Sequence, residues 1–293
     1  MKVAIFGPIC RDLNIVGRQR YCRPGGVTYY AGQALASLGV ETLVFATYGH
    51  EPSDWLAEFK PKLIHLPAEG TIQFINEYPV ENPDARIQKA RIFDNENKPK
   101  DIPQSELAAL DIIILGPLLH DNITKELVRF LASRATLVLA AQGMIRYLEE
   151  EKIVWKFPEN VWRILPYIDT VFLDDLELGF ISQKDDIQPG ARFLQEQGVK
   201  NVMVTQGHLG SQIFLGKDEY KIRYYRPRQL ADPTGAGDTY MAGYLRTLEW
   251  TDDPVARGEF AAMTATMGIE KLGPFVGTFE EVQKRLGQSS PPS

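Results

Sequence analysis

The sequence predicts an α/β fold: a doubly wound, mostly parallel sheet with helices on both faces, and a second, small β-sheet beside it. Short apolar segments alternate with helical ones along most of the chain, a pattern typical of parallel strands joined by crossover helices. Two stretches near residues 12–22 and 70–92 alternate apolar with polar residues, as half-exposed strands do. At 293 residues the chain is long enough for one large core.

The first half of the chain contains the start of the large sheet and most of the small one. Residues 2–6, 41–46 and 62–66 have the composition of buried strands, and residues 27–38 that of a small-residue helix closed by Gly39. Residues 71–78 and 86–93 flank a polar turn at 79–84. We expect these two strands to pair with residues 12–22 in a small sheet that stands off the main body.

From residue 111 the strands and helices alternate strictly. Strands are predicted at residues 112–115, 136–140, 170–173 and 201–205, with helices at 123–133, 176–180 and 189–197. Residues 213–215 and 220–225 suggest a hairpin, and the Trp-containing region 144–165 suggests mostly helix. We expect a single domain over residues 1–287, followed by a frayed Ser/Pro-rich tail at 288–293.

Composition excludes several classes of protein. The net charge is −6 and no long Lys/Arg run is present, which argues against nucleic-acid binding. No apolar run approaches the ~18 residues of a membrane span. The cysteines, Cys10 and Cys22, lack CxxC spacing and follow no secretory signal, so a reducing, cytoplasmic location is expected. The sequence contains neither a GxxxxGK[ST] loop nor an HExxH zinc motif.

A glycine-rich turn before a helix carries the strongest functional signal. Residues 232–239 read DPTGAGDT, and apolar residues recur behind them at helical spacing. Gly235, Ala236 and Gly237 would therefore place free backbone N–H groups at a helix N-terminus, which is a favourable site for an anion such as phosphate. Asp238 would repel a phosphate, unless it accepts a proton from a hydroxyl that attacks that phosphate.

This segment leads to a family resemblance. Residues 232–245, DPTGAGDTYMAGYL, resemble the signature near the C-terminus of PfkB (ribokinase-like) carbohydrate kinases. The rest of the chain resembles that family in the same order, from about residue 3 to residue 273. The resemblance implies a ribokinase-like fold, with Asp238 as the catalytic base and Gly235, Ala236 and Gly237 as the anion hole.

The resemblance also assigns binding residues. Asp174-Asp175-Leu176-Glu177 is similar to the family's Asn-x-x-Glu motif, which implies a role for Asp174 near the nucleotide and for Glu177 near magnesium. The run from Thr205 to Gly210 resembles its nucleotide-binding loop, with Thr205, Gly207 and Gly210 as contacts. Acceptor contacts are implied at seven positions: Asp12, Gly25, Gly26, Tyr30, Arg86, Gln142 and Arg146.

The implied reaction is ATP- and Mg²⁺-dependent phosphorylation of a hydroxyl on a small sugar, an inositol-like polyol or a nucleoside. In relatives the turn before the anion hole often helps to bind a monovalent cation such as K⁺, and Asp232 and Thr234 match those positions. In the kinase interpretation, segments near residues 12–22 and 70–92 would form a lid that closes over the acceptor. Lids of this family often pair between subunits, which suggests a homodimer formed through the lid.

The chain departs from the family pattern around the acceptor. Tyr30 stands where many relatives have a sugar-contacting Asn, Cys10 stands where ribokinases have Asn, and Asp174 replaces the Asn of Asn-x-x-Glu. These changes argue against ribose. Tyr30, Arg86-Ile87-Gln88 and Gln142-Gly143 followed by Arg146 look more like inositol-type or uncharacterised members, and the acceptor stays open.

Each assignment has a purely structural alternative. Asp12 could cap a turn, Tyr30 could be a core residue, Arg86 could be a solvated charge on an edge strand, Gln142 could simply end a strand, and Glu177 could lie on the helix surface.

Two other functions also compete with the kinase. One is a nucleotide-binding regulatory protein with degraded catalysis, suggested by the altered acceptor positions. The other is a dinucleotide oxidoreductase, although the expected GxGxxG after the first strand is absent.

Overall fold

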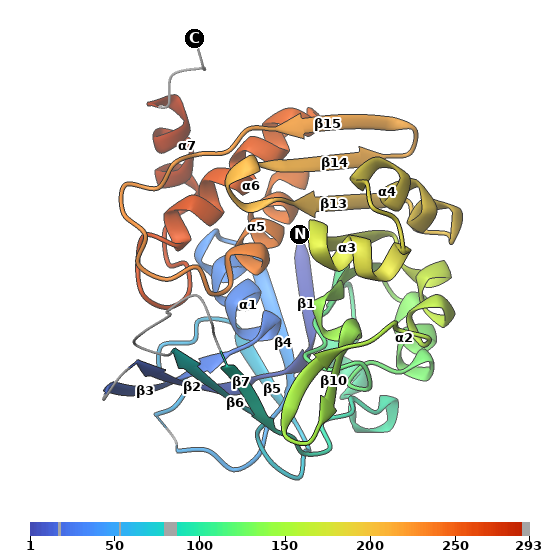
Figure 1. Cartoon of the computed structure of the whole chain (residues 1–293), viewed down its shortest axis with the longest axis vertical. Helices are drawn as coiled ribbons and strands as arrows, with labels where there is room; N and C mark the ends of the chain where they lie inside the picture. Colours follow the sequence, from blue (N-terminus) through green and yellow to red (C-terminus); the bar gives the residue numbers. More distant parts are fainter. Residues whose placement is uncertain (17–18, 53, 79–86, 289–293) are drawn as a thin grey trace.

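The structure is a computed structural model that describes residues 1–16, 19–52, 54–78 and 87–288. In this part of the chain nine strands form the large sheet (Figure 1). Their order across the sheet is β15 (Asp218–Ile222), β14 (Ser211–Leu215), β13 (Asn201–Thr205), β12 (Thr170–Asp174), β9 (Thr136–Ala140), β8 (Ile112–Leu115), β1 (Lys2–Pro8), β4 (Glu41–Thr47) and β5 (Lys62–Leu66).

The large sheet is parallel from β13 to β5. At one edge β14 pairs antiparallel with β13, and β15 pairs antiparallel with β14. Helices cover both faces (Figure 1). One face carries α1 (Val27–Ser37), α5 (Ala236–Arg246), α6 (Pro254–Gly268) and α7 (Phe279–Gly287). The other carries α2 (Lys125–Ala132), α3 (Asp175–Ser182) and α4 (Ile187–Glu196). The predicted doubly wound α/β fold is confirmed.

Alternating residues of the parallel strands build two separate cores. In β1, Ala4 and Phe6 belong to the core under α2–α4, whereas Val3 and Ile5 belong to the core under α1 and α5–α7. Burial of both faces explains why these strands appear in the sequence as continuous apolar runs. Their positions were therefore predictable within a few residues.

A second, smaller sheet lies at one end of the large sheet (Figure 1). Its order is β10 (Arg146–Glu149), β11 (Lys152–Trp155), β7 (Ile87–Arg91), β6 (Gln73–Tyr78), β2 (Cys10–Val16) and β3 (Gln19–Gly25). Strands β2 and β6 pair in parallel and the other pairs are antiparallel. The presence of this sheet agrees with the sequence analysis, and its action as a lid stays a prediction.

One prediction was wrong. Region 144–165 is not mostly helical: it contains the β10–β11 hairpin and short 3₁₀ turns. The hairpin pairs with β7, so the small sheet has a third segment that the sequence analysis did not assign to it. The 3₁₀ helices of the described residues are η1 (Pro99–Asp101), η2 (Gln104–Leu107), η3 (Ala141–Ile145), η4 (Val161–Arg163), η5 (Leu165–Tyr167), η6 (Gly207–Leu209) and η7 (Thr247–Glu249).

Candidate active site

The glycine-rich turn does precede a helix, as predicted. Gly235 is the N-cap of α5 and has a left-handed backbone (φ 74°), which glycine adopts without strain. The Ala236 N–H donates to Pro233 O at 3.2 Å, so it is not free as predicted, and the Thr239 N–H donates to Gly235 O at 2.9 Å. Gly237 and Asp238 lie between them in the first turn, where backbone N–H groups have no acceptor within the helix.

Close packing also requires glycine at position 235. A Cβ atom there would lie 2.4 Å from Cγ and Cδ1 of Tyr30. Tyr30 lies on α1, is only 4% exposed and therefore forms a floor beneath the turn. This contact joins an element of the predicted acceptor site, α1, to an element of the predicted phosphate site, α5.

Asp238 is half-buried in the first turn of α5. Loss of hydration raises the pKa of its carboxyl to about 6, while the positive charge of Arg146 acts in the opposite direction. A carboxylate with a pKa just below neutrality is ionised at pH 7 and basic enough to accept a proton.

Asp174 and Glu177 meet at the carboxyl end of β12. Asp174 is the N-cap of α3: its Oδ1 accepts the Glu177 N–H at 2.7 Å, and Glu177 Oε2 accepts the Asp174 N–H at 3.0 Å. Burial and the Asp174 charge raise the pKa of Glu177 to about 7, opposed by Arg146 and by a hydrogen bond with Gln142. The alternative that Glu177 lies on the helix surface is wrong, because Glu177 is only 4% exposed. The two residues form a capping box that uses one oxygen of each carboxylate.

The predicted nucleotide loop lies beside this pair. Thr205 ends β13 and is the register partner of Asp174 on β12. Gly207 (φ 54°) and Gly210 (φ 93°) bracket η6, and a Cβ on Gly210 would lie 2.1 Å from Ile222 O. At the start of β14, the Ser211 hydroxyl lies 2.8 Å from the Tyr240 hydroxyl of α5, so the loop and the glycine-rich turn are held close together.

The acceptor side is built by β2, β3 and α1. A Cβ on Gly25 would lie 2.1 Å from Oδ2 of Asp12, and the Cys10 thiol donates to Asp12 Oδ1 at 3.4 Å. Burial and the Asp12 charge raise the pKa of Cys10, so the thiol stays protonated and can donate. Gly26 is the N-cap of α1 (φ 95°).

Arg146 connects the two sides. It begins β10, directly after η3, which contains Gln142. Its charge lowers the pKa of Asp238, Glu177 and Cys10, groups that belong to three different elements. Its guanidinium also lies 5.9 Å from the ring centroid of Phe74 on β6.

The remaining predicted residues are Arg86 and the pair Asp232 and Thr234. Arg86 lies outside the described residues. The turn that contains Asp232 and Thr234 is well formed, with the Thr234 N–H donating to Asp232 Oδ1 at 3.0 Å. Thr234 is exposed, and cation binding at this turn stays a prediction.

The described residues contain no group of three or more His, Cys, Asp or Glu side chains arranged to hold a metal ion. A metal at Asp174 and Glu177 would therefore need most of its ligands from phosphate and water, as Mg²⁺ often has. Over the same residues, none of the helices combines the length and the apolar character that a membrane span requires.

Comparison with known families shows to which protein family the chain belongs. The model of the pfkB family of carbohydrate kinases matches residues 69–277, which is more than half of this chain. The chain belongs to the pfkB family of carbohydrate kinases. It is 22% identical over 254 residues to the cytidine kinase of Thermococcus kodakarensis, covering 84% of this chain and 87% of that protein. It is 25% identical over 201 residues to the inositol 3-kinase of Zea mays, covering 66% and 49%.

Solved structures agree on the fold. One is a pyrophosphate-dependent kinase in the ribokinase family, complexed with a pyrophosphate analog and myo-inositol (TM-score 0.80, 22% identity, 97% of this chain and 99% of that chain). Another is the Arabidopsis thaliana ribokinase complexed with ribose and ATP (TM-score 0.80, 17% identity, 97% and 98%). The ribokinase-like fold is thereby confirmed. The chain is a pfkB-family kinase, relatives of which act on sugars, nucleosides or inositol, and nothing in the comparisons favours the regulatory alternative.

Sequence reasoning missed two ion pairs of this kinase. Arg11 on β2 pairs with Glu51 in the loop after β4, and Glu270 pairs with Arg285 of α7. Their partners are 40 and 15 residues apart in the chain. No local motif marks such pairs, because only the tertiary fold brings the partners together.

Proposed function

We propose that this kinase transfers a phosphoryl group from ATP to a hydroxyl of a small sugar, an inositol-like polyol or a nucleoside. The observation that carries the proposal is the position of Asp238. This carboxylate lies in the first turn of α5, where backbone N–H groups suit a phosphate, and Gly235 at the start of the same helix packs against Tyr30 of α1.

In this proposal each residue of the site has a separate role in phosphoryl transfer. The Asp238 carboxylate accepts the proton of the attacking hydroxyl, and Asp12 orients the acceptor through a second hydroxyl. N–H groups of Gly237 and Asp238 at the α5 N-terminus face the charge that develops on the transferred group. Arg146, near Asp238 and Glu177, adds positive charge to the same region. Closure of the small sheet would exclude water and so limit ATP hydrolysis.

Magnesium fits the donor side. Asp174 and Glu177 offer oxygen ligands, the kind that Mg²⁺ prefers, and each carboxylate uses one oxygen for the helix cap. Bound there with the nucleotide, Mg²⁺ would neutralise charge on the phosphates. Asp232 and Thr234 are proposed to hold a monovalent cation that stabilises the turn, and an equal rate in K⁺ and in a large organic cation would contradict this role.

An inositol-like polyol is the first acceptor to test. Cys10, Asp12 and Arg146 combine a thiol, a carboxylate and a guanidinium, and similar proteins include an inositol 3-kinase and a kinase solved with myo-inositol. A nucleoside acceptor is the next choice, because the cytidine kinase aligns along most of both chains.

The test is a phosphorylation screen over polyols, hexoses, pentoses and nucleosides, with ATP and pyrophosphate as alternative donors. Asp238→Asn should fold normally and lose about 10²–10⁴-fold in kcat, the usual contribution of a general base. Turnover of one acceptor by wild type, with Asp238→Asn as the blank, supports the proposal. Full activity of Asp238→Asn would exclude Asp238 as the base.

A further inference from the structure

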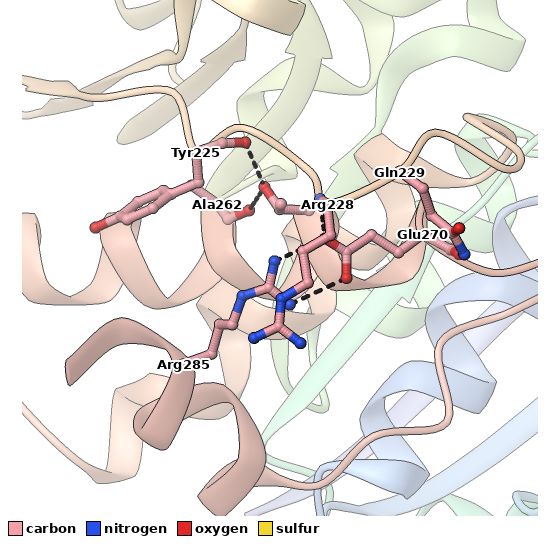
Figure 2. Close-up of polar contacts among 7 residues, drawn as sticks. Tyr225, Arg228, Gln229, Ala262, Glu270 and Arg285 are labelled. Atoms are coloured by element: carbon pink, nitrogen blue, oxygen red, sulfur yellow. Dashed lines mark hydrogen bonds and ion pairs between the residues drawn. The ribbon is translucent and has the colours of Figure 1, made fainter. Parts of the chain in front are cut away.

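The segment that precedes the glycine-rich turn, residues 225–232, is hydrogen-bonded to the C-terminal end of α6. Both the Ala231 N–H and the Asp232 N–H donate to Ile269 O, at 2.9 and 3.2 Å. Further back, the Thr266 hydroxyl lies 3.1 Å from Tyr225 O (Figure 2). Residues 225–232 therefore run along α6 with contacts at both ends.

Glu270 makes the contact between these two points. Its Oε1 accepts the Arg228 N–H at 2.6 Å, and its backbone O accepts a hydrogen bond from the Gln229 side chain at 3.1 Å. Figure 2 shows the Glu270 carboxylate turned toward Arg228 and Arg285. The same residue thus uses side chain and backbone to hold two successive residues of the segment.

Arg285 fixes the Glu270 carboxylate from α7. Its guanidinium donates from Nη2 to Oε1 at 2.7 Å and from Nη1 to Oε2 at 3.0 Å, a bidentate pair. The side chains of Arg285 and Glu270 are only 14% and 12% exposed. Such a pair is more rigid than a surface ion pair, because the planar fork allows one orientation and little water competes.

Space lies beside this pair. A cavity of about 190 Å³ is lined by Arg228, Glu270, Arg285 and the loop that follows α6. If the carboxylate lost its charge, the segment could move toward this cavity. Asp232 lies only three residues before Gly235, so such a movement would reach the first turn of α5.

We propose that the Glu270–Arg285 ion pair is a positioning device for the phosphoryl donor. It holds residues 225–232 against α6 and thereby sets the N–H groups at the α5 N-terminus. The inference rests on the proposed function, because it assumes that this turn binds the donor. Neither residue is proposed to touch the substrates.

Calorimetric titration of ADP and of pyrophosphate, each with Mg²⁺, tests the inference. Glu270→Gln and Arg285→Met should each raise the Kd of the donor probe about tenfold, as expected for loss of a charge-assisted contact. The Kd of the double variant should be no higher than the higher Kd of the two single variants, because the two side chains act as one unit. Arg285→Lys should recover part of the affinity.

Asp252→Asn is the matched control. It removes a carboxylate that pairs with Arg257 at the other end of α6, at 3.0 Å, and should leave the Kd within twofold of wild type. If thermal unfolding shows that Glu270→Gln does not fold, Arg285→Lys and Arg285→Met carry the test. Unchanged Kd values in folded variants overturn this inference alone, whereas a wild type that binds neither probe overturns the proposed function as well.

Discussion

At the scale of single residues, Asp238 predicts a pH dependence. Its pKa is raised to about 6 by burial, so the carboxylate is ionised above that pH and protonated below it. Because only the ionised form accepts a proton, kcat/KM should fall as pH decreases through about 6, about tenfold per pH unit at the acid end. Initial rates from pH 5 to 8 measure this.

Arg146 provides the control for that profile. Its charge lowers the pKa of Asp238, so Arg146→Gln should move the acid limb to higher pH. An acid limb near pH 4 in both proteins, the ordinary range of an exposed Asp, would contradict the assignment of Asp238 as the titrating base.

Substitution of Gly235 should lower stability for two reasons, backbone strain and steric overlap with Tyr30, and a control variant separates them. Gly235→Ala adds a left-handed alanine, costing about 1–2 kcal/mol, and a contact 2.4 Å from the Tyr30 ring, costing about 1–3 kcal/mol more. Gly216 also has a positive φ (55°), but nothing lies within 4 Å of its Cβ position. Urea unfolding should therefore show a larger loss for Gly235→Ala than for Gly216→Ala. Equal losses in the free energy of unfolding would show that the Tyr30 ring moves aside without an energetic penalty.

The identity of residues at the phosphate side was predictable from sequence, and their surroundings were not. Local spacing is enough to recognise Gly235 and Asp238, since turn and helix are contiguous in the chain. That Tyr30 lies beneath the turn depends on the packing of α1 against α5, which no local pattern encodes.

At the scale of elements, the β10–β11 hairpin shows why one prediction failed. The segment from Arg146 to Trp155 contains three consecutive Glu residues, which favour helix and carry no turn signal. In the structure Glu150 and Glu151 form the turn with φ values of 46° and 67°, a conformation that usually calls for Asn or Gly. Pairing with β7 through tertiary contacts overrides the local preference.

The Arg11–Glu51 ion pair joins the small sheet to the loop after β4, and its loss should cost stability. Glu51 is 6% exposed and Arg11 31% exposed. Arg11→Met leaves a buried carboxylate without its partner and should lower the free energy of unfolding by about 1–3 kcal/mol, less than for a fully buried pair.

The double variant Arg11→Met/Glu51→Leu distinguishes charge from packing in this pair. It should be more stable in urea unfolding than Arg11→Met alone, because no unpaired charge remains. Lys62→Met, which breaks the exposed Lys62–Glu106 pair, should change stability by less than about 0.5 kcal/mol. A double variant less stable than Arg11→Met would show that the pair acts through its shape instead.

At the scale of the whole molecule, the candidate site residues come from both sheets and both helical layers. Asp174 and Thr205 end neighbouring parallel strands, so the strand order brings them together. Asp12 comes from the small sheet and Asp238 from the helical layer. The class of fold was predictable from alternation alone, whereas the third segment of the small sheet was not.

Ligand binding should stabilise the entire fold. Mg²⁺-ADP at 100 times its Kd would add about 2.7 kcal/mol to the free energy of unfolding, and the accepted polyol or nucleoside should raise the Tm further. Differential scanning fluorimetry of wild type and Asp238→Asn measures both shifts without turnover in the variant. No stabilisation of either protein by Mg²⁺-ADP would contradict this prediction.

The contact between Tyr30 and Gly235 also determines which segments could be exchanged among related kinases. A glycine-rich turn transplanted from another family member would arrive shaped for a different residue beneath it. Chimeras that exchange residues 232–246 should therefore carry α1 with them. The unit to exchange is therefore the pair α1 and α5, which are distant in the chain and packed together in the fold.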